Sequence, residues 1–113
     1  MFDQLRSYGW LVMTPELIEE VARRFALLSD PTRLRILHTL MERGELSVGE
    51  TAEESGTSRF NASAHLNRLA LGGLVVRRQA GTTRYYRVSD SNLRNVCDAM
   101  CSAMKERVRA PIR

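Results

Sequence analysis

The most constraining feature of this sequence is a pair of helix starts that follow each other closely. Ser47-Val48-Gly49-Glu50 has the spacing of a capping box, in which the Ser47 hydroxyl and the Glu50 carboxylate each accept a hydrogen bond from a free backbone N–H. A Ser-Gly-Thr turn, in which Gly56 can adopt a left-handed conformation, ends this short helix. Ser58 then caps a second helix, predicted over 59–71. Two short helices joined by a tight turn that contains glycine predict a helix-turn-helix.

Two further helices are predicted before this motif. Thr14 is suited to cap a helix over 15–29, because Pro15 follows it at the first helical position. Asp30-Pro31 repeats the same signal, and Gly44 is suited to end the second helix.

A β-hairpin and a last helix are predicted after the motif. Segments 74–78 and 83–88 are rich in β-branched and aromatic residues and flank a turn over 79–82. Asp90 or Ser91 then caps a helix over 91–109. The predicted fold is mainly α with a small β-hairpin: a winged helix-turn-helix domain over 14–109, preceded by an N-terminal extension over 1–13.

The charge of the chain is concentrated in one part of this fold. The chain has 17 basic and 13 acidic residues, yet the stretch from Ser55 to Arg87 contains no carboxylate at all. This acid-free segment comprises the second helix of the motif and the hairpin, and its six arginines are Arg59, Arg68, Arg77, Arg78, Arg84 and Arg87. Such a distribution is typical of a surface that binds a polyanion and favours double-stranded DNA as partner, whereas a solvated charged face is the simpler alternative.

The helix over 59–71 is predicted to have one packed face and one reading face. A helical projection places Ala62, Leu66 and Leu69 on the inner side, and the polar residues on the outer side. The outer side offers donors and acceptors of the kind that major-groove readout requires. The candidate DNA-binding residues are Ser58, Arg59, Phe60, Asn61, Ser63, Ala64, His65, Asn67 and Arg68 on this helix, and Arg78, Gly81, Thr82 and Arg84 on the hairpin.

Length and composition exclude several other classes of protein. With 113 residues the chain fits one domain, and no window approaches the roughly 18 apolar residues of a membrane span. With no secretory signal and only two cysteines, a cytoplasmic location is expected. We expect no enzyme, because no nucleophile stands near a base and no cluster of carboxylates is visible in the sequence.

The motifs together resemble one known family. RFALLSDPTRLRIL (24–37), the SVGE box, SRFNASAHLNRLALGGLV (58–75) and TTRYYRV (82–88) are similar to the ArsR/SmtB winged-helix repressors. The resemblance extends from about Leu17 to Met104. It implies a transcriptional regulator that is released from its operator by an inducer, with Ser58, Arg59, Asn61 and Ser63 near the bases.

The resemblance also implies a homodimer formed by the first and last helices, 15–29 and 91–109. Apolar stripes on both helices agree with such an interface. The expected interface residues are Leu17, Val21, Phe25, Leu93, Val96, Met100 and Met104.

The inducer sites best known in the family are absent from this chain. In arsenic and cadmium sensors a pair of cysteines occupies the positions that Ser47 and Gly49 hold here. Zinc and nickel sensors place ligands on the last helix, but both histidines of this chain, His38 and His65, lie before that helix. The soft-ligand pair is Cys97 and Cys101.

The spacing of this cysteine pair allows two interpretations. Residues four apart on a helix have Cβ atoms about 5 to 6 Å apart, which is too far for an unstrained disulfide but suits chelation of As(III) or another soft metal. Arg94 and Lys105 favour the thiolate form, and Asp98 opposes it. The alternative is that both cysteines only pack as small hydrophobic residues. The alternative function for the whole chain is a winged-helix architectural module that binds DNA without sequence preference and has no inducer.

Overall fold

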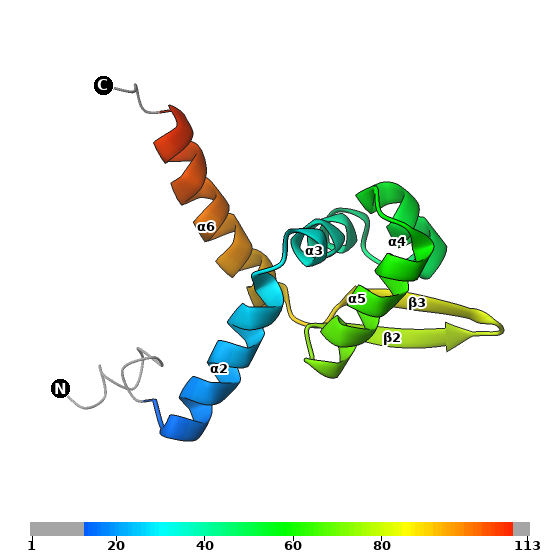
Figure 1. Cartoon of the computed structure of the whole chain (residues 1–113), viewed down its shortest axis with the longest axis horizontal. Helices are drawn as coiled ribbons and strands as arrows, with labels where there is room; N and C mark the ends of the chain where they lie inside the picture. Colours follow the sequence, from blue (N-terminus) through cyan, green and yellow to red (C-terminus); the bar gives the residue numbers. More distant parts are fainter. Residues whose placement is uncertain (1–12, 110–113) are drawn as a thin grey trace.

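The winged helix-turn-helix arrangement predicted from the sequence is present. The structure is a computed structural model that describes residues 13–109; most of the predicted extension over 1–13 therefore lies outside the described residues. The elements are α2 (Pro15–Leu28), α3 (Pro31–Arg43), β1 (Leu46–Ser47), α4 (Val48–Ser55), α5 (Arg59–Leu71), β2 (Val75–Ala80), β3 (Thr83–Val88) and α6 (Ser91–Arg109). In Figure 1, α3, α4, α5 and the sheet form one body, and α2 and α6 extend from it on the side away from the hairpin tip.

The local signals of the helix-turn-helix are confirmed in detail. The backbone N–H of Ser47 donates to Glu50 Oε1 at 2.9 Å, and the Glu50 N–H donates to Ser47 Oγ at 3.1 Å. Gly56 ends α4 with φ 73°. The Ser58 hydroxyl accepts the N–H of Asn61 at 3.1 Å and so caps α5.

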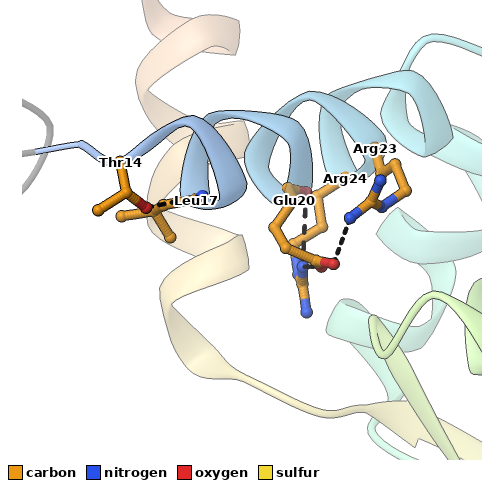
Figure 2. A network of polar contacts seen from close by, with 5 residues as sticks. All are labelled: Thr14, Leu17, Glu20, Arg23 and Arg24. Carbon is orange, nitrogen blue, oxygen red and sulfur yellow. Dashed lines mark hydrogen bonds and ion pairs between the residues drawn. The ribbon is translucent and has the colours of Figure 1, made fainter.

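Both earlier helices also begin at their predicted caps. Thr14 Oγ1 accepts the N–H of Leu17 at 3.1 Å, as Figure 2 shows. The same figure shows the Glu20 carboxylate between Arg23 and Arg24, which both donate to it along the exposed side of α2. These hydrogen bonds lower the pKa of Glu20.

The corner between α2 and α3 is held by a buried arginine. Asp30 caps α3 by accepting the N–H of Arg33 at 3.0 Å. The Arg33 side chain, 9% exposed, turns back and donates through Nε to the Leu27 carbonyl at 2.8 Å. Because this carbonyl is one of the free acceptors at the end of α2, the contact joins the two helices.

The sheet is larger than predicted, and the hairpin turn is tighter. β2 includes Gln79 and Ala80, so the turn consists of only Gly81 and Thr82 rather than 79–82. Gly81 has φ 62° and occupies the first central position, where a two-residue hairpin turn favours glycine. A third strand, β1, pairs with β3 through Leu46 and Tyr86, which gives the order β1-β3-β2.

The core lies between α3, α5 and the sheet. Its buried members are Ile36, Leu37, Leu40, Leu66, Leu69, Leu74, Val75 and Tyr86. By contrast, α2 has no buried residue, and each residue of α6 whose side chain is described is exposed or only half-buried. Leu27 and Leu28 of α2 and Leu93 of α6 pack against this core, whereas most of the other apolar residues of the two helices are left exposed.

Candidate nucleic-acid interface

The helix α5 presents its predicted faces. Ala62, Leu66 and Leu69 are each 0% exposed and pack into the body, as the helical projection requires. The opposite side is exposed along its whole length. The exposed residues on it are Ser58, Arg59, Phe60, Asn61, Ser63, Ala64, Asn67 and Arg68.

The arginines of this surface are free to meet a ligand. Within residues 13–109, no ion pair and no side-chain hydrogen bond engages Arg59, Arg68 or Arg84. An unpaired guanidinium offers a fork of donors that suits phosphate oxygens and guanine edges alike.

A cleft lies between the helix-turn-helix and the wing turn. Its volume is about 1030 Å³, and it is lined by the first turns of α4 and α5, by Glu53, by Ser63 and by Thr82–Arg84. The Arg59 guanidinium lies close to Gly49 in the first turn of α4. A Cβ atom added to Gly49 would be 3.7 Å from Arg59 Cζ. The cleft brings Arg59 and Arg84 together from two elements of the acid-free segment.

The wing carries one paired and one unpaired arginine of the two predicted to bind DNA. Arg78 donates through Nη2 to Glu45 Oε1 at 2.7 Å, and its guanidinium lies 4.8 Å from the centre of the Tyr85 ring. Its hydrogen bond also lowers the pKa of the Glu45 carboxyl. The charge of Arg78 is thus balanced by Glu45, whereas Arg84 is exposed and unpaired within the described residues. The sequence analysis did not anticipate the partner of Arg78.

His65 is less exposed than the other candidate DNA-binding residues of α5. Its side chain is half-buried, and its Nδ1 atom is buried without a hydrogen-bond partner in the part of the chain that the structure describes. Its half-buried position leaves it less surface for contact with DNA than the exposed residues beside it.

The cysteine pair lies on α6 as predicted, but its electrostatic surroundings differ from the prediction. Cys97 is half-buried and Cys101 is exposed. Burial raises the pKa of the Cys97 thiol, and Asp98 and Cys101 raise it further. Arg94 donates to the Met41 carbonyl at 2.8 Å and does not lower the pKa of Cys97. Among residues 13–109, no group of three or more His, Cys, Asp or Glu side chains could hold a metal ion, so one protomer supplies only the two thiols.

Most of the residues predicted for a dimer interface are exposed on α2 and α6. Phe25 is 55% and Met100 62% exposed, and Leu17, Val96 and Met104 are each 45% exposed. Val21 is half-buried, whereas Leu93 is half-buried against the protomer's own core. Ile18, 51% exposed beside Leu17, extends the apolar surface of α2 and was missed by the sequence analysis.

The chain is similar to known helix-turn-helix proteins. A family model described as a helix-turn-helix domain matches residues 28–78. The transcriptional regulator KmtR of Mycobacterium tuberculosis is 39% identical over 84 residues, which are 74% of this chain and 64% of KmtR. A transcriptional repressor of Synechocystis, a homologue of SmtB, is 30% identical over 104 residues, or 92% of this chain and 78% of that protein. The chain thus spans less than two thirds of KmtR, and it spans 34% and 35% of two other curated relatives.

Solved structures agree with the fold. The homodimeric winged helix-turn-helix domain of Mb0332 from Mycobacterium bovis, described as a "possible ArsR-family transcriptional regulator", has a TM-score of 0.75 at 32% identity, covering 87% of this chain and 90% of that one. The antimony-specific transcriptional repressor AntR has a TM-score of 0.78 at 27% identity, covering 88% and 89%. No helix among residues 13–109 combines the length and the apolar character needed to cross a bilayer.

Proposed function

Because the chain belongs to the ArsR/SmtB family of winged helix-turn-helix transcriptional regulators, we propose that it acts in the cytoplasm as a homodimeric repressor of a palindromic operator. In this proposal α5 of each protomer enters the major groove, and the wing contacts the neighbouring backbone. The two half-sites are then about 34 to 36 Å apart, one turn of DNA.

The observation that carries the proposal is the exposed surface of α5, which has unpaired arginines and no acidic residue. Arg59 and Arg68 are exposed and unpaired within the described residues, and Asn61 and Asn67 stand between them. Arginine pairs with guanine and asparagine with adenine in the major groove, so this surface has the chemistry of direct readout. Arg84 at the edge of the cleft is suited to a phosphate.

The exposed faces of α2 and α6 support the homodimer. Phe25, Met100 and Met104 give these helices apolar surfaces that a soluble monomer rarely leaves in water. The homodimeric state of the Mycobacterium bovis domain supports the same assembly. A two-fold axis between the protomers matches the symmetry of a palindromic operator.

The test is fluorescence anisotropy of a labelled duplex from the region upstream of the gene, compared with a scrambled duplex at one fixed salt concentration. Tighter binding of the upstream duplex is expected. Equal affinity for the two duplexes, with a salt dependence set only by the phosphates, would favour a non-specific architectural protein instead.

Arg68→Ala is expected to weaken operator binding by about tenfold without changing the fold, because the side chain is exposed and unpaired. A phosphate contact would also reduce the slope of log K against log salt by about 0.9, whereas a guanine contact would relax specificity at one position. Anisotropy titrations at several salt concentrations measure both effects. Arg23→Ala is the control, because it removes the same charge from α2, where Arg23 pairs with Glu20. Equal losses in the two variants would exclude a local role for Arg68.

We further propose that a soft metal or metalloid, As(III) in the first instance, is the inducer and binds the thiols of Cys97 and Cys101. The two residues stand one turn apart on α6, and one protomer offers no third ligand among residues 13–109. Dimer symmetry supplies further thiols if the two α6 helices meet. Three thiolates complete the pyramidal coordination of As(III), and four suit a tetrahedral site for a soft metal ion. Metal binding also overcomes the raised pKa of Cys97, because the ion displaces the thiol proton.

In the variants Cys97→Ser and Cys101→Ser, operator binding is expected to stay near the wild-type value while release by As(III) is lost. The measurement is anisotropy of the preformed complex during titration with As(III). Ser102→Ala is the control, since its side chain is exposed on the same helix and is not a soft ligand. Release that persists in both cysteine variants would assign the thiols to packing only.

A further inference from the structure

An unusually exposed aromatic side chain stands at the start of α5. Phe60 is 83% exposed, although most of the large apolar side chains of the domain body are buried in its core. It lies in the first turn of the helix, directly after Arg59. Covering a phenyl ring with a partner is favourable, so Phe60 offers an apolar contact to a ligand that binds beside Arg59.

The surroundings of Phe60 identify the class of that ligand. The ring lines the cleft together with Arg59, Ser63 and Arg84. Ala64, also exposed, follows one turn later on the same side of α5 and extends the apolar surface by a methyl group. Glu50 and Glu53 of α4 also line this cleft, but no residue of α5 or of the wing strands is acidic. The positive charge of the acid-free segment favours a polyanion over a basic or neutral surface.

We propose that Phe60, assisted by Ala64, contacts the 5-methyl groups of thymines in the operator and is a specificity-determining residue. The inference rests on the proposed operator binding and adds to it the base that this side chain selects. In the major groove, thymine is the base that presents an apolar group, while the other base edges present donors and acceptors that a phenyl ring cannot satisfy. A wedge between base pairs is disfavoured, because wedges of that kind act from the minor groove.

The experiment uses duplexes that the full-length protein itself selects from a randomised library. The selected duplex is prepared in two forms, with thymine and with uracil at every T position, which differ only in the 5-methyl groups. The wild type is expected to bind the uracil form about fourfold more weakly for each methyl that Phe60 contacts. Phe60→Ala should bind the thymine form more weakly than the wild type and show no preference between the two forms.

Two further readouts separate this role from other contributions of the helix. The salt dependence of Phe60→Ala should equal that of the wild type, because an apolar contact neutralises no phosphate. Leu71→Ala is the matched control: Leu71 is 82% exposed on the same helix, but at its C-terminal end. This variant should keep the full preference for thymine.

The possible outcomes separate the inference from the proposed function. If the library yields no preferred sequence, operator readout and the role of Phe60 both fail. If a sequence is selected but uracil substitution leaves wild-type affinity unchanged, the proposed operator binding is supported and the thymine contact is excluded. A preference for thymine that survives in Phe60→Ala, or that is lost in Leu71→Ala, would also overturn the inference. Circular dichroism should show an unchanged fold for Phe60→Ala, since the replaced ring is exposed.

Discussion

Replacement of Met100 by glutamate is expected to convert the dimer into monomers and to weaken operator binding by about 100-fold or more. Met100 is 62% exposed in the protomer and lies in the middle of the apolar face of α6. In the proposed dimer this face is buried, so the new carboxylate would lose its hydration without gaining a partner. A monomer binds one half-site only and loses the gain in affinity that comes from holding two, which is of the order of 100-fold to 10,000-fold.

Sedimentation equilibrium measures the first effect, and anisotropy with a full operator and with a single half-site measures the second. The full operator should lose its advantage over the half-site in Met100→Glu. Ser102→Glu is the matched control, because it adds the same charge to an exposed position on the opposite side of α6. A Met100→Glu protein that remains dimeric would show that α6 does not form the interface.

Local signals made most of the fold predictable. Each of the caps at Thr14, Asp30, Ser47 and Ser58 depends on residues within three positions of one another, and each forms the expected hydrogen bond. The periodicity of α5 likewise separated its packed side from its exposed side. Capping and periodicity are properties of a short segment, and they can therefore be recognised without knowing the rest of the structure.

Features that depend on distant residues were not predictable in the same way. The strand β1 has only two residues, too few for a periodic pattern, and it forms because Tyr86 of β3 pairs with Leu46. Glu45 directly precedes β1, and its carboxylate accepts a hydrogen bond from Arg78 of β2, a partner that lies 33 positions away in the sequence. Burial of Arg33 depends similarly on how α2 meets α3.

The apolar stripe of α6 shows a further limit of sequence patterns. Leu93 and Met100 belong to the same stripe, yet Leu93 packs on the core of its own protomer while Met100 remains exposed. Periodicity indicates that a helix face is to be covered, but it does not identify the covering partner. The sequence pattern alone therefore does not predict a dimer. The exposure of Met100 in the folded protomer is the additional observation that supports one.

Leu66→Ala is expected to lower the free energy of unfolding by about 2 to 5 kcal/mol. Leu66 is 0% exposed and belongs to the core between α5, α3 and the sheet. Truncation removes its apolar contacts and leaves a cavity in close-packed surroundings, and this cost is large for a domain whose total stability is about 5 to 15 kcal/mol. Urea unfolding followed by circular dichroism measures the change as a lower midpoint at an unchanged slope.

The control for this prediction is Leu71→Ala, which makes the same chemical change on the same helix at an 82% exposed position. Its free energy of unfolding should remain within about 0.5 kcal/mol of the wild type. Both variants must be compared at one protein concentration, because unfolding of a dimer is coupled to its dissociation. Equal midpoints for the two variants would contradict the assignment of Leu66 to the core. If the midpoints differ as expected, the folded Leu66→Ala protein should still bind the operator at low temperature, because Leu66 holds α5 from behind and does not reach its exposed surface.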